Sequence, residues 1–132
     1  MQNGKIAVPT NNPGGLTAQR SDHFGHCESY TIISIAGGVI AGVEAVRNQG
    51  HEAGGCMVPV RNLSQLGVNA IIVGGIGGGP LRGFANEGID VFFAAKDSYG
   101  DVQSVVDGLM QSKLNLMEPS QACKGSGNCH GH

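Results

Sequence analysis

The sequence lacks any apolar run near the roughly 20 residues that a membrane-spanning helix requires, so we expect no membrane association. Its net charge is only −2, which leaves it without the strongly basic character of proteins that bind DNA or RNA. The opening residues 1–5 lack the apolar core of a signal peptide. These absences predict a cytoplasmic protein with no nucleic-acid or membrane partner.

Residue arrangements typical of hydrolytic enzymes are missing as well. The chain shows no Ser-His-Asp arrangement, and Asp22, Glu52 and Asp97 occur singly, without the paired carboxylates that acid–base catalysis uses. A hydrolase on an α/β fold stays an alternative that no motif supports. We therefore expect a protein that is not an enzyme.

Cysteine is scarce, with four residues in the chain, and cytoplasmic thiols are expected to stay reduced. Cys27, Cys56, Cys123 and Cys129 are therefore interpreted as ligands, reactive groups or small buried residues rather than as disulfides. Glycine, by contrast, is abundant: it makes up 23 of 132 residues, which is about 17%, compared with roughly 7% in an average protein. Many backbone amides are thus open to the close approach of a ligand.

Short β-branched runs and periodic apolar segments predict five strands and three helices. The strands are expected at 5–9, 30–35, 39–46, 70–73 and 91–94, and the helices at 57–66, 80–86 and 101–113. The last helix has the clearest pattern, because its apolar residues recur at helical spacing between Val102 and Met110.

The order β-β-β-α-β-α-β-α places helices between the later strands, so these strands are expected to be parallel with right-handed crossovers. The prediction is a three-layer α/β/α sandwich around a mixed five-stranded sheet, with a folded domain at residues 1–117. The segments after the first, third, fourth and fifth strands then meet at one edge. Ligands of open α/β sheets bind at such a carboxyl edge, so we expect the site there.

The segment after the first strand concentrates metal-binding residue types. His23 and His26 lie three residues apart and Cys27 follows directly, so a loop could direct two of them at one ion. Thiolate and imidazole are ligands of iron–sulfur centres, zinc and Cu(I), whereas magnesium and calcium prefer carboxylates. The alternative is a pair of solvated histidines and a buried cysteine.

The segment after the third strand adds His51, in a glycine-rich stretch, and Cys56, just before an expected helix. The positive end of that helix would favour the thiolate form of Cys56. The alternatives are a turn histidine that bonds the backbone and a cysteine that fills the core.

The glycine-rich turn at 74–80 follows an expected buried strand and precedes a helix. Its position would present the backbone amides of Gly75, Gly77 and Gly78 to an anion. It is a weak nucleotide motif, because Pro80 stands where the third glycine of the dinucleotide fingerprint would be, and Gly-Lys-Ser/Thr is missing. A tight connection without a ligand is the alternative.

Residues 118–132 differ in composition from the rest and are predicted to form a flexible tail. The tail carries two thiols and two imidazoles, at Cys123, Cys129, His130 and His132. Their spacing matches no standard zinc finger. We interpret the tail as a chelating segment for Zn or another soft divalent ion, and a disordered end without specific contacts is the alternative.

Three stretches taken together resemble the dinitrogenase iron–molybdenum cofactor biosynthesis family, whose small members are NifX-like or like the NifB C-terminal domain. They are Ser-Asp-His-Phe-Gly-His-Cys at 21–27, Asn-Gln-Gly-His-Glu-Ala-Gly-Gly-Cys at 48–56 and Gly-Gly-Ile-Gly-Gly-Gly-Pro-Leu at 74–81. The resemblance covers about residues 4–112. It implies a ribonuclease H-like fold and a site for an anionic iron–sulfur or molybdenum–iron–sulfur cluster, with His23 as a ligand. It does not imply nitrogen fixation.

These observations favour a protein that binds and carries such a cluster in cofactor biosynthesis or as an accessory factor. Its partners would be cluster-assembly or recipient proteins. The alternative is a small metal chaperone or sensor that binds Zn, Cu or Ni mainly through the tail. The predicted cofactor-binding residues are His23, His26, Cys27, His51, Cys56, Gly75, Gly77 and Gly78, and the predicted metal ligands are His23, Cys123, Cys129, His130 and His132.

Overall fold

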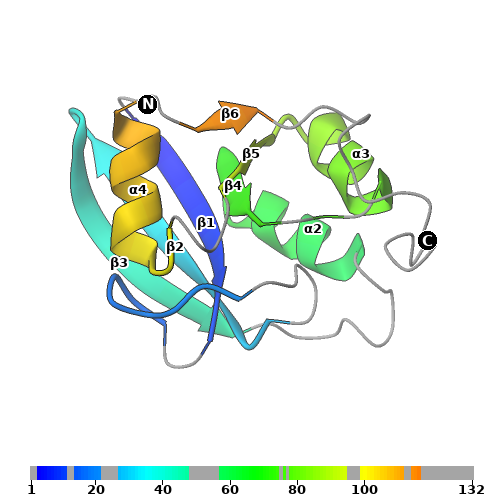
Figure 1. Ribbon diagram of the computed structural model, residues 1–132. Helices are drawn as coiled ribbons and strands as arrows, with labels where there is room; N and C mark the ends of the chain where they lie inside the picture. The colour runs from blue at the N-terminus through cyan, green and yellow to red at the C-terminus, as the bar shows by residue number, and fades with distance from the viewer. Residues whose placement is uncertain are drawn as a thin grey trace.

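A mixed β-sheet runs through the centre of the computed structural model (Figure 1). The structure describes residues 3–11, 14–21, 27–47, 57–74, 76, 78–94, 99–111 and 114–116. The strands in chain order are β1 (Gly4–Thr10), β2 (Ser29–Ala36), β3 (Val39–Arg47), β4 (Ala70–Val73), β5 (Asp90–Phe93) and β6 (Asn115–Leu116). The helices within these residues are α2 (Met57–Gln65), α3 (Gly78–Asn86) and α4 (Val102–Met110).

The sheet has the strand order β3-β2-β1-β4-β5-β6. Strand β2 is antiparallel to both of its neighbours, β1 and β3. Strand β4 is parallel to β1, and β5 is parallel to β4. It follows that β1, β3, β4 and β5 point the same way, and their C-terminal ends form one side of the sheet, which we call the carboxyl edge.

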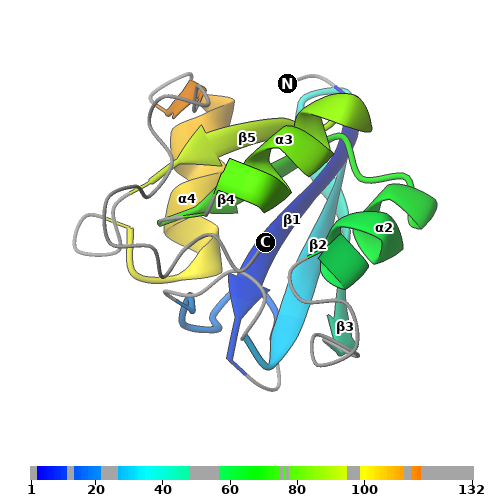
Figure 2. The ribbon, with the colours of Figure 1, turned by 90° about the vertical axis from the view of Figure 1, so that its right-hand side faces the viewer.

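Helices cover both faces of the sheet, with α4 on one face and α2 and α3 on the other (Figures 1 and 2). Successive side chains of a strand point to opposite faces, and β4 follows this rule. Ile71 and Val73 pack in the cluster that includes α2 and α3, whereas Ile72 packs in the cluster that includes α4. All three are almost completely buried, so the sheet is the middle layer of a sandwich.

Helix α4 illustrates how the sequence produces this packing. Val102, Val105 and Val106 are completely buried, and full burial of such side chains stabilises a fold by roughly 1.5–3 kcal/mol each. Asp101 is the N-cap, and its carboxylate accepts a 2.9 Å hydrogen bond from the backbone N–H of Ser104. The apolar spacing therefore fixes the buried face, and the cap fixes where the helix begins.

The predicted three-layer α/β/α class with a mixed sheet is confirmed, and the strand at 70–73 has the predicted limits. Two details differ. Helix α3 begins at Gly78, two residues before the predicted start, and β6 adds a two-residue strand to the five expected. A strand of two residues is too short to show an alternating pattern in the sequence. Its pairing is not local either, because its partner β5 lies more than 20 residues earlier in the chain. The tail predicted at 118–132 lies outside the described residues.

Candidate functional site

Four connections leave the sheet at the carboxyl edge, as the strand directions predict. They are 11–28 after β1, 48–56 after β3, 74–77 after β4 and 94–101 after β5. The register places their starting points together, because Thr10 pairs with Ser29 and Ser29 pairs with Arg47. On the other side of β1, Val73 pairs with Phe93. The predicted ligand residues upstream of the tail therefore lie in, or directly beside, segments that begin at one edge.

Most of these ligand residues lie outside the described residues. Those outside are His23, His26, His51, Cys56, Gly75 and Gly77, together with the four tail residues Cys123, Cys129, His130 and His132. The described ones are Cys27 and Gly78. The site is therefore described below through the surroundings of these two residues and through the residues that attach each connection to the sheet and the helices.

The connection that carries His23 and His26 is anchored on both sides. Before it, the backbone N–H of Ser21 donates a 3.0 Å hydrogen bond to the carbonyl of Pro9, near the end of β1. After it, Cys27 is 5% exposed and packs in the hydrophobic cluster under α2 and α3. This burial matches the small-core-residue interpretation of Cys27, and a ligand role for its thiol stays a prediction.

The connection that carries His51 and Cys56 runs from the end of β3 to the start of α2. Arg47 ends β3 and is exposed, and α2 begins at Met57, as predicted. Cys56 therefore directly precedes a helix. The unpaired amides and the dipole at a helix start both favour negative charge there.

The glycine-rich turn leads directly into α3, because Gly78 is already helical. A Cβ atom at Gly78 would lie 3.2 Å from Nη1 of Arg82, so the missing side chain leaves room for the guanidinium beside the helix start. A cation at the positive end of a helix is unfavourable by itself. An anion bound at this turn would offset the repulsion between the guanidinium and the positive end of the helix.

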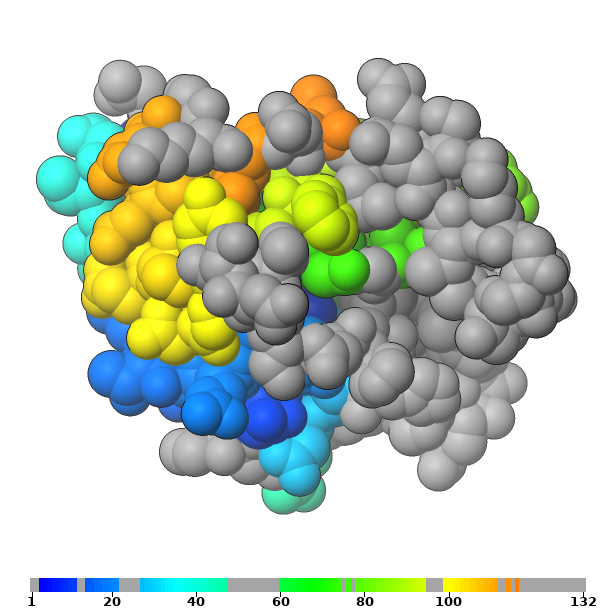
Figure 3. Space-filling view, in the orientation of Figure 1, coloured from blue at the N-terminus to red at the C-terminus, as the bar shows by residue number. Residues whose placement is uncertain are grey.

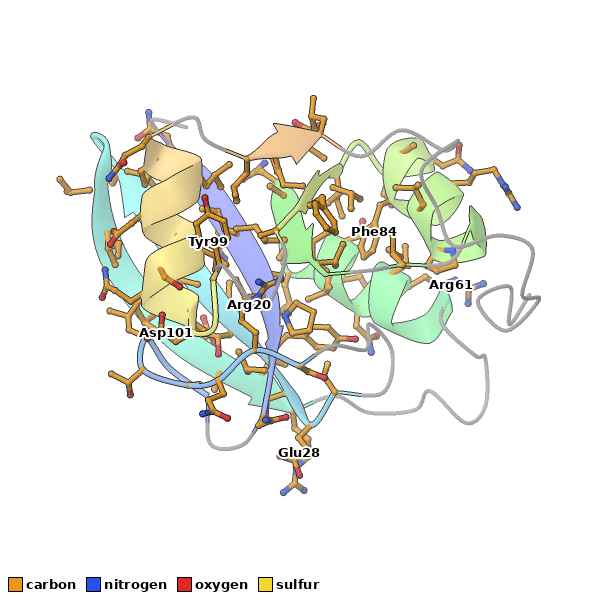
Figure 4. All side chains as sticks on the ribbon, in the orientation of Figure 1. Arg20, Glu28, Arg61, Phe84, Tyr99 and Asp101 are labelled. Atoms are coloured by element: carbon orange, nitrogen blue, oxygen red, sulfur yellow. The ribbon has the colours of Figure 1, made fainter. Side chains whose placement is uncertain are left out.

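Arg20 is the residue at the carboxyl edge that our sequence analysis missed. Its side chain is 1% exposed, and among the described residues it is the largest fully buried side chain. Its Nη1 donates a 2.8 Å hydrogen bond to the carbonyl of Tyr99, and its Nη2 donates a 2.9 Å bond to the carbonyl of Ala94. Figure 4 shows the guanidinium pointing from the 14–21 segment toward Tyr99. The only signal in the sequence is its place just before the Ser-Asp-His-Phe-Gly stretch.

The segment around Arg20 is held between β1 and the beginning of α4. Arg20 forms an antiparallel bridge with Thr10, and its backbone N–H donates to the carbonyl of Gly100 at 3.0 Å. Gln19 forms a second bridge with Asp101. The space-filling view shows the blue 14–21 surface against the yellow start of α4 (Figure 3). The segment thus connects the sheet to the helix that starts at this edge.

Asp101, at the start of α4, is a titratable group whose hydrogen bonds change its pKa. The N–H of Ser104 donates to its carboxylate, and the Ser104 hydroxyl adds to the effect, so the pKa of Asp101 lies below its ordinary value. Its carboxylate is therefore charged at neutral pH and committed to capping α4. The sequence reasoning assigned this residue to the helix start, and that assignment is confirmed.

A groove of about 250 Å³ lies away from the glycine-rich turn, between α2 and the β2–β3 part of the sheet. It is lined by Tyr30, Val46, Arg47, Asn62, Leu63, Gln65 and Leu66. Of the predicted ligand residues that the structure describes, Cys27 and Gly78, neither is among them.

The described residues also bear on the predicted metal centre and on the predicted lack of a membrane span. Within them, no group of three His, Cys, Asp or Glu side chains is placed to hold a metal ion, and all five histidines and three of the four cysteines lie outside them. No helix in the described part of the chain is long and apolar enough to cross a membrane.

The comparison with protein families identifies the class to which this fold and edge belong. Residues 4–112 match the family described as dinitrogenase iron-molybdenum cofactor. The protein therefore belongs to that family, as the three sequence stretches predicted. An uncharacterized protein of Methanocaldococcus jannaschii is 33% identical over 118 residues, which are 86% of this chain and 92% of the relative.

Solved structures confirm the fold. The apo form of the orange protein from Desulfovibrio gigas has a TM-score of 0.75 at 20% identity, over 89% of this chain and 93% of that one. A provisionally named NifB protein from Thermotoga has a TM-score of 0.73 at 23% identity, over 92% of this chain and 99% of that one. At these identities the likeness concerns the fold alone.

Proposed function

We propose that this protein binds and carries an anionic metal–sulfur cluster, iron–sulfur or iron–molybdenum-cofactor-like, as an accessory protein of cofactor biosynthesis. The observation that carries the proposal is the meeting of four connections at the carboxyl edge, since three of them contain the predicted ligands. Membership of the iron–molybdenum cofactor family supports it. Cluster-assembly and recipient proteins are the partners that this role requires.

Negative charge on the cargo fits the groups that the edge presents. Two helices, α2 and α3, begin there, and helix starts favour anions. Arg82 lies beside the start of α3, where a bound anion would lie between a cation and the helix amides. Each effect is modest by itself, and all act in the same direction.

We assign His23 as the principal ligand, with His26, His51 and Cys56 from the same edge and the amides of Gly75, Gly77 and Gly78 around the cargo. Imidazole and thiolate are suited to iron–sulfur and related centres. Cys27 is the weakest of the proposed ligands, because its side chain is buried in the core.

A carrier role, in the cytoplasm, fits this site better than catalysis. Asp101 pairs with Gln19 of the Arg20 segment, and its carboxylate caps α4 instead of facing a reacting group. In this proposal the tail is a separate chelating segment that binds Zn or another soft divalent ion and assists delivery.

The test compares two variants with two kinds of cargo under anaerobic conditions. Wild-type protein, His23→Ala and the double variant Cys123→Ser with Cys129→Ser are titrated with the tetrathiomolybdate dianion, with a cluster reconstituted from ferrous iron and sulfide, and with Zn. We expect His23→Ala to weaken binding of the sulfur-containing cargo by at least about tenfold, with Zn binding retained. The double cysteine variant should lose Zn binding and keep the cargo.

The opposite result would replace this proposal. If the double cysteine variant lost both activities and His23→Ala changed neither, the tail would be the whole metal site. The protein would then be a small chaperone or sensor for Zn, Cu or Ni.

A further inference from the structure

The burial of Arg20 demands an explanation, because a charged side chain removed from water is costly unless hydrogen bonds compensate it. Among the described residues Arg20 is the only buried one that carries a formal charge, and the other buried polar groups of side chains include the hydroxyls of Thr10, Ser29, Tyr30 and Thr31. A hydrophobic side chain of similar volume would fill the same space without that cost. The position of the guanidinium therefore points to a specific task at the carboxyl edge.

The two carbonyls that accept hydrogen bonds from the guanidinium lie at opposite ends of the connection that follows β5. Ala94 is the last described residue before segment 95–98, and Tyr99 is the first described residue after it. The carbonyls of both accept from the same guanidinium, at 2.9 and 2.8 Å. One side chain thus holds together the two ends of the connection that follows β5.

The same guanidinium also adjoins the beginning of the glycine-rich turn. A Cβ atom at Gly74 would lie 3.8 Å from Nη2 of Arg20 and 3.6 Å from the carbonyl oxygen of Ala94. The N–H of Ala94 donates to the carbonyl of Val73, which precedes Gly74. The ends of β4 and β5 are therefore fixed to each other and to Arg20.

The backbone of Arg20 completes the link to the connection that carries His23 and His26. Arg20 pairs with Thr10 at the end of β1, and the following residue, Ser21, donates to Pro9. Arg20 and Ser21 therefore bond both ends of the connection after β5 and the end of β1, and the Arg20 guanidinium lies beside Gly74.

A planar guanidinium is suited to this arrangement, because its N–H groups form a rigid fork with fixed donor directions. Lysine carries the same charge as a compact ammonium group and lacks the fork. Replacement by lysine would keep the charge and disturb the simultaneous hold on the carbonyls of Ala94 and Tyr99.

We infer that Arg20 is a positioning residue for the candidate site: its guanidinium fork fixes the ends of segment 95–98 relative to Gly74 and to the histidine-bearing connection, and thereby sets the affinity for the anionic cargo. This inference rests on the proposed function. Arg20 acts through the connections that it holds, and direct contact with the cargo is not part of the inference.

The experiment compares Arg20→Lys and Arg20→Met with the control Arg61→Met. Arg61 is exposed on α2, and its replacement removes one positive charge without touching the Ala94 and Tyr99 carbonyls (Figure 4). The first measurement is the backbone amide NMR spectrum of each variant without cargo. Both Arg20 variants should shift the amides of Gly74 and of residues 95–101, while the amides of Gly67 and Gly88, at the other edge of the sheet, stay in place.

The second measurement is titration of the same variants with the tetrathiomolybdate dianion. Both Arg20 variants should bind it at least about tenfold more weakly than wild type, as expected for residues that orient ligands, and Arg61→Met should bind like wild type. If Arg20→Lys bound like wild type, the fork would be unnecessary and the inference would be wrong. Shifted amides with unchanged affinity would also overturn it.

Two further outcomes can be distinguished from a failure of the inference itself. If Arg20→Met does not fold, Arg20→Lys, which retains the charge and most of the volume, provides both measurements. If wild-type protein binds neither tetrathiomolybdate nor the reconstituted iron–sulfur cluster, the proposed function fails. The role of Arg20 in setting affinity then fails with it, whereas the amide spectra still show whether its guanidinium holds the edge together.

Discussion

The two edges of the sheet differ in the length of the connections that join the strands and helices there. At the amino edge the connections are short: Gly37–Gly38 joins β2 to β3, residues 66–69 lead from α2 to β4, and residues 87–89 lead from α3 to β5. Each contains glycine with positive φ, which allows the chain to turn within a few residues. Residues 66–69 and 87–89 are further fixed by backbone hydrogen bonds back to the helices that they follow.

The connections at the carboxyl edge serve a different purpose. They include the two longest in the chain, 11–28 and 48–56, and contain three of the five histidines. Tight turns minimise the amount of chain outside the sheet, whereas long connections provide room for side chains that bind a ligand. We propose that the amino edge closes the fold and that the carboxyl edge carries the function. The following predictions test this division.

The largest expected effect is on stability at the carboxyl edge, where Gly14 combines strain with close packing. Its φ is +83°, and an added Cβ would lie 2.8 Å from Cβ of Ala45 and 3.0 Å from Oγ1 of Thr31. Gly14→Ala should therefore cost about 1–2 kcal/mol for the left-handed backbone and about 1–3 kcal/mol more for the clash. Urea denaturation measures the change in the free energy of unfolding.

Gly67→Ala is the matched control at the amino edge. Gly67 has φ of +81°, and nothing lies within 4 Å of an added Cβ. This variant should lose only the backbone contribution, about 1–2 kcal/mol. Equal losses for the two variants would show that the 14–15 turn moves away at no cost, which would contradict the tight packing of the carboxyl edge.

The second prediction concerns the shared site. His23→Ala and His51→Ala should each weaken tetrathiomolybdate binding by at least about tenfold, which is about 1.4 kcal/mol. Because both histidines are proposed to hold one cargo, the loss in the double variant should be smaller than the sum of the single losses. Additive losses would mean that the two residues act on separate sites.

Asn69→Ala is the amino-edge control for these titrations. The side-chain oxygen of Asn69 accepts a 2.8 Å hydrogen bond from the backbone N–H of Lys5, at the edge opposite to the one where the connections with the proposed ligands begin. Its removal should cost about 1 kcal/mol of stability and leave binding unchanged. A change in binding would show that the two edges are coupled.

The third prediction concerns the cap of α4. Asp101→Ala should cost about 1 kcal/mol of stability at neutral pH, because the cap bond to Ser104 is lost. The pKa of Asp101 is lowered in the folded state, so the carboxylate stabilises the fold above its unfolded pKa of about 3.9. That contribution disappears as the pH falls below this value and through the lower folded pKa. The stabilities of wild type and variant should therefore converge in acid, which thermal melts at several pH values would measure.

The smallest effect is expected for the tail. Truncation after Pro119 should change stability by less than about 0.5 kcal/mol in metal-free buffer, because residues beyond Ser120 have no periodic apolar face. A midpoint several degrees lower by calorimetry would show that the tail packs on the folded domain. The prediction of a separate tail at 118–132 would then be wrong.

Local patterns in the sequence were sufficient to predict five strands, three helices and their order. The run Ala70–Val73 predicted a buried strand with the observed limits, and the spacing of valines from Val102 onward predicted the buried face of α4. Both are encoded by neighbours in the chain, since strand and helix periodicities repeat within a few residues. The order of these elements then predicted the parallel strands and the carboxyl edge.

The burial and hydrogen bonds of Arg20, and the existence of β6, depend on the tertiary structure alone. The guanidinium of Arg20 bonds carbonyls that lie 74 and 79 residues away in the chain, and β6 pairs with a strand more than 20 residues before it. An arginine in a polar stretch has the same local sequence whether it is exposed or buried, because its burial depends on which distant segments pack around it. For that reason the sequence determined most of the elements and the edge at which their connections meet, and the tertiary structure determined which distant carbonyls the Arg20 guanidinium bonds.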